Sequence, residues 1–414
     1  MTNKSTPVLG IDFGTSNSAV GYVKSGSPYL INIEGDETTL PTAIFFDVRA
    51  QEWCIGRAAN QSLIRGDEGR YMRALKSILG TSLLHERRWL GGKLVTYADI
   101  ISNFLQQIKT RAETQAEQRF DHALSGRPVF FHSASETKNA KALKDLTQCY
   151  INAGFKSVEF MYEPEAAAIA NGGIDKNELA LIVDIGGGTS DYCLFKSADI
   201  GIDVLACNGV RVGGTNFDRS LSIDHVMPLL GHREMIRREW GNDTLRAPNH
   251  IFQDLATWSK IPSLYAEKPR ELAADLHKLA LNKEPFTRLI TVLEEEIGHD
   301  IAFAVEDGKI ETNNNGQSDI DLAFIEAQLS AQLTSEKLGK SLEEHAKNIS
   351  DAALETLQLS DYTADQVDKV IFVGGSSHMK IIEQNIAPHF KGADLLYSNA
   401  FTAIIDGLAI ASGR

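Results

Sequence analysis

The sequence predicts an α/β protein built from two related halves. One phrase occurs twice, as VLGIDFGTSNSAVGYV at residues 8–23 and as ALIVDIGGGTSDYCLF at residues 180–195. Each copy passes from an apolar run through Asp and Gly to Thr-Ser and a second apolar run, and such a repeat indicates a duplicated unit. Strand patterns alternate with helix patterns, which predicts parallel strand pairing. The 414 residues also exceed the usual size of a single core.

The first half reads as a strand meander followed by alternating helices and strands. Short β-branched and aromatic runs separated by turn residues predict strands, and apolar residues at helical spacing predict helices. On these patterns we expect strands over 8–48, a helix over 99–120, a buried strand over 128–134, a helix over 136–153 with Gly154 as its C-cap, and a strand entering a helix over 158–173.

The second half begins with strands again and then becomes helical and charged. An Asn-Gly pair inside EDGKIETNNNGQSDIDLAF favours a hairpin turn. We expect strands over 179–195 and 200–212, a hairpin over 306–324, a long and sometimes interrupted helix over 325–357, a strand, glycine pair and helix over 367–386, and a last helix from residue 402.

Composition narrows the classes of function. The net charge is −14, and no basic block offsets it, so nucleic acid is excluded as an expected partner. No apolar run reaches the length of a membrane helix, and the polar start MTNKSTP does not resemble a signal peptide. The four cysteines (Cys54, Cys149, Cys193 and Cys207) are scattered without a CxxC pair. We therefore expect a soluble protein of the reducing cytoplasm, without a membrane association.

Eight motifs follow one another in an order that no single motif would establish. They are IDFGTSNSAV, PTAIFF, IGRAANQ, LKSILG, AGFKSVEFMYEPEAAAIA, VDIGGGTSD, GGTNFD and VIFVGGSSHM. The ordered set resembles the ATPase domain of the seventy-kilodalton heat-shock chaperone family, within the actin, sugar-kinase and heat-shock ATPase superfamily, and is most similar to the short YegD-type chaperones. The resemblance runs from about residue 7 to residue 413 and ends where the family's peptide-binding domain would begin.

This resemblance implies a two-lobed actin-like ATPase fold of duplicated ribonuclease H-like domains with inserted subdomains. Residues 1–175 would form the first lobe, with the first phosphate hairpin and one inserted subdomain. Residues 176–414 would form the second lobe, with the second hairpin, an adenosine motif and a largely helical insertion at about 219–325. The implied ligands are ATP or ADP and Mg²⁺, whether or not K⁺ assists, and the implied partner is a client or other protein.

The two repeated phrases would hold phosphates and a metal ion. Glycines let the backbone approach phosphate oxygens, and successive N–H groups can bind them. The phosphate-binding residues would be Gly14, Thr15, Ser16 and Asn17 in the first phrase and Gly186, Gly187, Gly188 and Thr189 in the second. Asp12 and Asp184 follow their apolar strands at matching positions, and Mg²⁺ prefers one or two carboxylates completed by water and phosphate. We expect both in the metal shell.

The family pattern also implies the groups that act on the attacking water. Lys76 falls at the lysine near the γ-phosphate, and Glu163 falls at the carboxylate between the domains. Thr189 falls at a hydroxyl on the γ-phosphate side, and Asp184 and Asp191 are the carboxylates that could orient water or accept its proton. Taken singly, Lys76 would be a solvated helix residue and Glu163 a helix start before Pro. Their joint occurrence favours the catalytic interpretation.

The remaining expected nucleotide contacts come from later motifs. In the family's pattern a glycine pair lets adenine lie on bare backbone, and a second pair faces the phosphates. The corresponding residues are Gly374, Gly375, Ser376 and His378, Gly213 and Gly214, and Glu295. His378 stands where the family has an arginine that stacks on adenine, and Gly298 stands where it has a lysine. These departures put the base specificity in question.

Four functions fit the motifs. The first is an Mg²⁺-dependent ATPase that changes the angle between its lobes and signals to a protein partner. The second is a nucleotide-binding scaffold with little hydrolysis. The third is a small-molecule kinase of the same superfamily, although no sugar-binding motif is evident. The fourth is an actin-like filament. The ATPase is the preferred interpretation.

Overall fold

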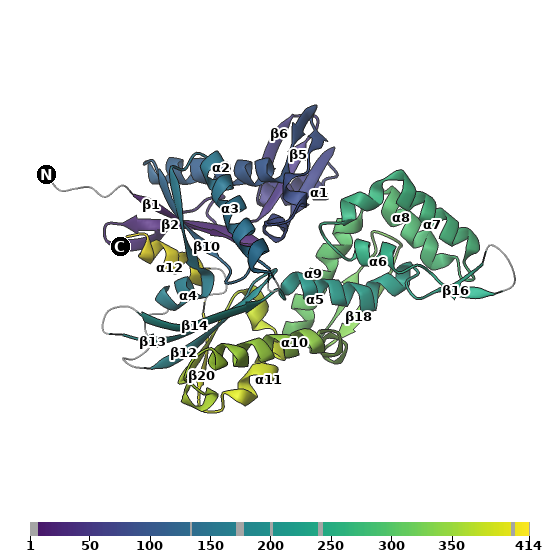
Figure 1. Cartoon of the computed structure of the whole chain (residues 1–414). Coiled ribbons are helices and arrows are strands. Elements are labelled where there is room, and N and C mark those ends of the chain that lie inside the picture. The colour runs from purple at the N-terminus through teal and green to yellow at the C-terminus, as the bar shows by residue number, and fades with distance from the viewer. Residues whose placement is uncertain are drawn as a thin grey trace. The chain divides into compact units, whose positions relative to one another are not determined.

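The computed structural model describes residues 7–132, 135–170, 178–198, 202–238, 243–398 and 402–413. The chain divides into two compact units, the first comprising Met1–Gly214 and Lys347–Arg414 and the second comprising Thr215–Ala346 (Figure 1). The predicted insertion at about 219–325 falls inside the second unit. The predicted lobe boundary at residue 175 falls inside the first unit and stays a prediction.

The first sheet of the first unit has the strand order β11-β10-β1-β2-β3. Its strands are β1 (Val8–Phe13), β2 (Asn17–Lys24), β3 (Ser27–Leu30), β10 (His122–Arg127) and β11 (Ser157–Tyr162), with β4 (Thr39–Pro41) paired to β2. The first three strands form an antiparallel meander, and β10 and β11 run parallel to β1. The predicted meander and the predicted parallel pairing are both confirmed.

The second sheet repeats this topology. Its order is β14-β13-β12-β19-β20. Its strands are β12 (Leu179–Ile185), β13 (Ser190–Ser197), β14 (Ile202–Val210), β19 (Lys369–Val373) and β20 (Asp394–Tyr397). The first three are again antiparallel, and β19 and β20 run parallel to β12. A meander followed by two parallel strands therefore occurs twice, which confirms the predicted duplication.

Helices and small sheets complete the first unit. Its helices are α1 (Arg57–Ile64), α2 (Tyr97–Ala116), α3 (Glu136–Asn152), α4 (Glu163–Ala170), α11 (Lys380–Ile386) and α12 (Ala403–Ala411). Its small sheets join β5 (Ala43–Asp47) to β6 (Glu52–Ile55) and β7 (Gly69–Arg73), and β8 (Arg88–Leu90) to β9 (Lys93–Val95). As predicted, α3 ends just before Gly154, whose φ of +93° is a conformation that glycine adopts readily.

The second unit is mainly helical. Its elements are α5, which begins at the last residue of the first unit (Gly214–Leu221), β15 (Met235–Arg237), β16 (Thr244–Arg246), α6 (His250–Leu255), α7 (Glu267–Leu279), α8 (Glu284–Glu294), α9 (Gly298–Asn315), β17 (Gln317–Asp321), β18 (Ser330–Thr334) and the first part of α10 (Ser335–Gln358). Among the described residues, no helix has both the length and the apolar character needed to span a bilayer.

The predicted hairpin at the Asn-Gly pair is wrong. Residues up to Asn315 continue α9, and Gly316 ends that helix with a φ of +88° and an N–H that donates to Thr312 O at 2.8 Å. Left-handed glycine serves a helix end as well as a hairpin turn. The hairpin instead joins β17 to β18, so residues 330–334 are not helical as predicted. Their alternating exposed and buried side chains have the period of a strand.

The predicted strand at PVFFHSA is also wrong over residues 128–132, and its last two residues, 133 and 134, lie outside the described residues. The strand of this region is β10, which ends at Arg127, immediately before the proline. Val129 and Phe131 are nevertheless buried, at 7 % and 6 % exposure, because the segment after β10 runs through the interior. Because these side chains are buried although the segment belongs to no sheet, the apolar run has the pattern of a buried strand.

Helices α4 and α12 pack against each other between the two sheets (Figure 1). Ala166 of α4 and Leu408 of α12 join a cluster with side chains of the first sheet, whereas Ala167 and Ala168 join a cluster with the second sheet. A Cβ atom on Gly407 would overlap Ala166 O and lie 2.5 Å from Ala166 C. The absence of a side chain at Gly407 therefore allows the two helices to touch.

We predict that Gly407→Ala destabilises the protein by about 1–3 kcal/mol, because the added methyl group must push α12 away from α4. Alanine is the better helix former by about 1 kcal/mol, so a loss of stability can only report packing. Urea unfolding at 25 °C would measure the change. Gly392→Ala is the matched control, since a Cβ atom there meets nothing within 4 Å. Equal stability of both variants would contradict the proposed close contact.

Candidate functional site

The turns of the two repeated hairpins lie against each other. The first turn joins β1 to β2 and holds Thr15 and Ser16, and the second joins β12 to β13 and holds Gly187 and Gly188. A Cβ atom on Gly187 would overlap Ser16 Oγ, and one on Gly188 would lie 3.1 Å from Thr15 Oγ1. Bare backbone of the second turn thus faces hydroxyls of the first. The fold brings together the two predicted phosphate-binding turns, which the sequence places far apart.

The loop after β14 packs on the second turn. Gly214 N–H donates to Gly186 O at 3.0 Å, and Ser190 Oγ donates to Val212 O at 2.7 Å. A Cβ atom on Gly213 would lie 2.7 Å from Gly186 O and 2.8 Å from the next two residues' backbone. Any larger side chain at Gly213 would displace the turn. The predicted glycine pair therefore shapes the same backbone surface.

The glycine pair after β19 reaches the same place. Gly374 has a φ of +82°, and a Cβ atom on it would lie 2.8 Å from Asp184 Oδ1. Both the left-handed backbone and the lack of space favour glycine there. A Cβ atom on Gly214 would lie 2.6 Å from Ser376 Oγ. The segment from Gly374 to Ser376 therefore borders both the carboxylate and the loop at Gly213.

Five charged side chains meet beside these turns. Lys76, Glu163, Asp184 and Asp191 are buried, and Asp12 is partly exposed. The Lys76 ammonium pairs with the Glu163 carboxylate. Asp12 is the next-to-last residue of β1 and Asp184 the next-to-last residue of β12, so the matching positions in the two hairpins put both carboxylates near one end of the sheets. The structure therefore joins the predicted metal and catalytic residues into one cluster.

Crowding of carboxylates raises their pKa values. Burial, followed by the negative charge of Glu163, raises the pKa of Asp12 and that of Asp191 to about 7. Burial, followed by the negative charges of Glu163, Asp191 and Asp12, raises the pKa of Asp184 well above its ordinary value. Since Asp12 keeps some solvent contact, its shift reflects dense surroundings rather than complete exclusion of water. The cluster therefore holds more negative charge than its one lysine balances.

Lys76 remains charged in spite of its burial. Burial acts to lower its pKa, but the charges of Glu163 and Asp12 and the hydrogen bond that Lys76 donates to Glu163 outweigh this effect, and the pKa is raised. Lys76 lies in a short 3₁₀ turn, Leu75–Ile78, which follows Ala74 in the left-handed conformation at φ +56°. Such a backbone is uncommon for alanine and is found where the surroundings hold it in place.

Three positioning residues escaped the sequence analysis. Arg211 Nη2 donates to Ser77 O at 2.8 Å, and Arg211 Nη1 lies 2.9 Å from His132 Nδ1. His132 Nε2 is 2.7 Å from Leu79 O, so these side chains hold the segment of Lys76 against the loop after β14. Val129 N–H donates to Asp191 Oδ1 at 2.6 Å. No local pattern marks such contacts, because their partners are distant in the sequence.

The cluster fits a divalent cation together with phosphate. The cluster contains four carboxylates and one ammonium group, those of Asp12, Asp184, Asp191 and Glu163 and that of Lys76. Bare backbone lines the adjoining turns. Among the described residues, no group of three or more His, Cys, Asp or Glu side chains is placed to hold a metal ion by itself. An ion here would need other ligands, and Mg²⁺ takes one or two carboxylates plus water and phosphate oxygens. Asp12 and Asp184 are the residues suited to hold it.

Two of the predicted adenine contacts, His378 and Glu295, belong to different units. The ring of His378 stacks on Tyr397, with centroids 5.6 Å apart and planes at 29°. Glu295 belongs to the second unit, where it is exposed just after the end of α8. The roles of His378 and Glu295 in binding a base stay predictions.

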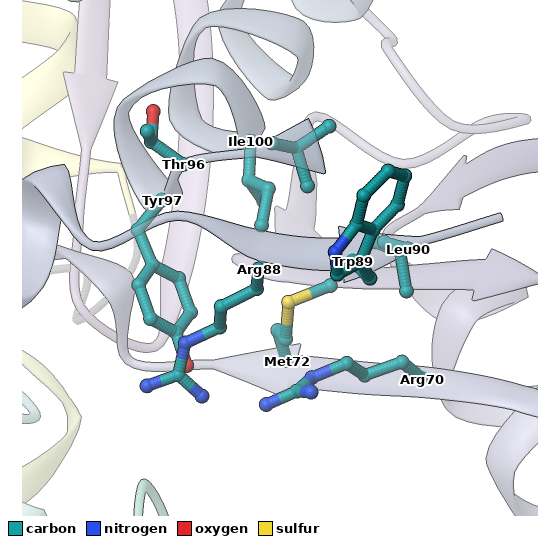
Figure 2. A pocket seen from close by; sticks show the side chains of 9 residues that line it. Arg70, Met72, Arg88, Trp89, Leu90, Thr96, Tyr97 and Ile100 are labelled. Atoms are coloured by element: carbon teal, nitrogen blue, oxygen red, sulfur yellow. The ribbon is translucent and has the colours of Figure 1, made fainter. Parts of the chain in front are cut away.

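A pocket at the β8–β9 hairpin lies apart from these residues (Figure 2). Side chains of β7, β8, β9 and the start of α2 line it. Trp89 is 74 % exposed there, and the Arg88 guanidinium lies 4.8 Å from the centre of the Tyr97 ring. None of the predicted phosphate, metal or catalytic residues lines this pocket.

We predict that the ligand-free protein becomes more stable as the pH falls from 8 to 6. The folded-state pKa of Asp191, about 7, lies above its ordinary value of 3.8. The stabilisation that protonated Asp191 provides is therefore complete below its pKa in the unfolded state, and it is lost as the pH rises through 7. Asp191→Asn should reduce this dependence, since asparagine does not titrate, and Asp12, with a pKa also of about 7, should account for part of what remains. Thermal melts across this pH range would measure both slopes.

The exposed Asp36→Asn is the matched control and should leave the slope unchanged. The opposite result is a wild-type melting temperature that decreases as the pH is lowered from 8 to 6, with the same slope in Asp191→Asn. It would show that these carboxylates are not crowded in the folded protein.

A comparison with known families agrees with this geometry. The model of the family described as Hsp70 protein matches residues 8–89 and 86–246, more than half of the 414 residues. The matched span contains both hairpin turns and all five charged residues of the cluster. Members of this family are ATPases that typically bind ATP or ADP with Mg²⁺. The match and the mixed α/β structure confirm the two-lobed actin-like ATPase fold. The chain belongs to the Hsp70 protein family.

Proposed function

We propose that this protein is an Mg²⁺-dependent ATP hydrolase whose nucleotide state controls its interaction with a protein partner. The observation that carries the proposal is the meeting of two glycine-containing turns beside one buried lysine and four carboxylates. Phosphoryl transfer to water needs positioning and charge compensation rather than covalent chemistry from the protein. This cluster supplies both kinds of group.

The turns would bind the nucleotide phosphates. Backbone N–H groups of Gly14 to Asn17 and of Gly186 to Thr189 are the proposed donors, supported by the close contact of the two turns. When bound, Mg²⁺ would compensate the charge of the phosphates. Asp12 and Asp184 would hold it, because the two residues occupy the next-to-last positions of corresponding strands. Gly213 and Gly374 would keep the surrounding space free of side chains.

Lys76 and Asp191 would act on the hydrolytic step. The Lys76 ammonium, held by Glu163, offers positive charge where negative charge accumulates in the transition state. Asp191 is the carboxylate that we propose to accept a proton from the attacking water. Its pKa of about 7 suits a general base near neutral pH, and the Thr189 side chain and Val129 N–H hold it by hydrogen bonds.

The remaining finer assignments are also proposals. The motif order supports a place among the short YegD-type chaperones. The Hsp70 family's general interaction with client proteins supports an output to a protein partner. The four free cysteines, all within the described residues, support a reducing cytoplasm as the compartment.

The test combines calorimetry with product analysis. Isothermal titration with Mg-ATP and Mg-ADP would measure binding, and release of ADP and phosphate would be followed in wild type, Lys76→Ala and Asp184→Asn. We expect both variants to lose at least about 100-fold in phosphate release, as expected when a group that compensates transition-state charge is removed. Lys144→Ala and Asp394→Asn are controls on the exposed surface and should match wild type.

Each outcome separates the candidate functions. Binding with phosphate release that both variants lose supports the ATPase. Binding with release no faster than in the variants indicates a nucleotide-binding scaffold. ADP in excess over phosphate indicates transfer to an acceptor, as in a kinase. No binding by wild type would return these glycines to a structural role. Because Lys76→Ala leaves Glu163 buried without its partner, binding of Mg-ADP by the variant serves as the check of folding.

A further inference from the structure

Two cysteines face each other on adjacent strands of the second sheet. Cys193 of β13 lies directly opposite Cys207 of β14 in the antiparallel register, and the Cys207 thiol donates to Cys193 Sγ at 3.2 Å. Opposite residues of such strands have Cα atoms about 4.5–5.5 Å apart. Disulfides form over Cα separations of about 4.4–6.8 Å. The sheet therefore holds two thiols within the reach of a covalent bond.

The two thiols differ in accessibility. Cys193 is completely buried, in a cluster that includes Ala167 and Ala168 of α4. Cys207 packs at the edge of the same cluster and is only partly buried. The hydrogen bond with Cys207, together with burial, raises the pKa of Cys193. A small reagent from solvent would therefore meet Cys207 first, and Cys193 is placed to react with its neighbour.

We propose that Cys193 and Cys207 form a dithiol that hydrogen peroxide oxidises to an intramolecular disulfide. The Cys207 thiol gives up its proton, its thiolate attacks one peroxide oxygen, the O–O bond breaks, and the leaving hydroxide takes up that proton as water, which leaves a sulfenic acid on Cys207. The sulfur of Cys193 then attacks Cys207 Sγ, and the leaving hydroxide takes the Cys193 proton as water. Overall, two thiols and one peroxide give one disulfide and two waters, and a thiol reductant reverses the change.

This modification site adjoins the proposed general base. Asp191 precedes Cys193 by two residues in β13, so both side chains lie on one face. Gly209 lies opposite Asp191, and a Cβ atom on it would be 2.8 Å from Asp191 Oδ1. Disulfide formation shortens the distance between the sulfurs from 3.2 Å to about 2.05 Å and draws the strands together there. If the proposed function holds, oxidation of Cys193 and Cys207 to the disulfide slows ATP hydrolysis.

The chemical part is tested without nucleotide. The reduced full-length chain is treated with hydrogen peroxide, its remaining thiols are alkylated in denaturant, and its peptides are mapped by mass spectrometry. Of the four thiols, we expect two to be lost, with Cys193 and Cys207 linked and dithiothreitol restoring both. Cys54→Ala, at the other partly buried cysteine, is the matched control and should still form the link. Cys207→Ala should abolish it.

Two results would overturn the modification site. One is wild-type protein that keeps four thiols under peroxide or links Cys207 to Cys54. The other is sulfinic acid at Cys207 without a link to Cys193. Should Cys207→Ala fail to fold, the wild-type peptide map decides the question by itself, and Cys193→Ala provides a second variant.

The functional part compares phosphate release by the reduced and oxidised protein. We expect oxidation to slow it by about tenfold, because a misplacement of about 1 Å can cost up to about 100-fold. Cys207→Ala should lose this sensitivity to peroxide. A link that leaves the rate unchanged would overturn the coupling to Asp191. If the protein forms the link under peroxide but hydrolyses no ATP when it is reduced, the modification site is supported and the proposed function is overturned.

Discussion

The contact between α4 and α12 is the constraint on which the first unit depends. Each helix packs on both sheets, so their separation determines how the carboxyl ends of β1 and β12 approach each other. Gly407 permits that contact because a side chain there would occupy the position of Ala166 O. Glu163 begins α4, so the same packing also places one carboxylate of the charged cluster.

The charged cluster then follows from topology. Two copies of one sheet, each with an aspartate at the end of its first strand, bring Asp12 and Asp184 to the same region. Water can solvate such carboxylates only partly, and their pKa values rise as a result. Lys76 offsets part of this charge, and the proposed Mg²⁺ would offset a further part. The charge that the proposed cation binding needs would therefore oppose stability at this site, as is common where function needs concentrated charge.

Particular residues show how far local patterns could predict the molecule. The repeated Asp-Gly-Thr-Ser phrase predicted both hairpins, and strand–helix alternation predicted the parallel strands. At Gly316 the pattern failed, because a left-handed glycine suits a helix end and a hairpin turn alike. At Val129 it failed because burial belongs to a segment that crosses the interior outside any sheet. Arg211, His132 and the Cys193–Cys207 pair had no local signal, since their contacts join distant segments.

By itself the sequence determined the duplicated α/β topology, the positions of the glycine turns and the set of residues that we predict to form the site. These features are local, because strand and helix periods and the conformational freedom of glycine act over a few residues. Only the tertiary structure decided which side chains meet. Lys76 meets Glu163 across 87 residues of chain, and Asp191 meets Val129 across 62. Such pairs depend on the packing of sheets and helices, and burial among other charges then sets the pKa values of the site's carboxylates.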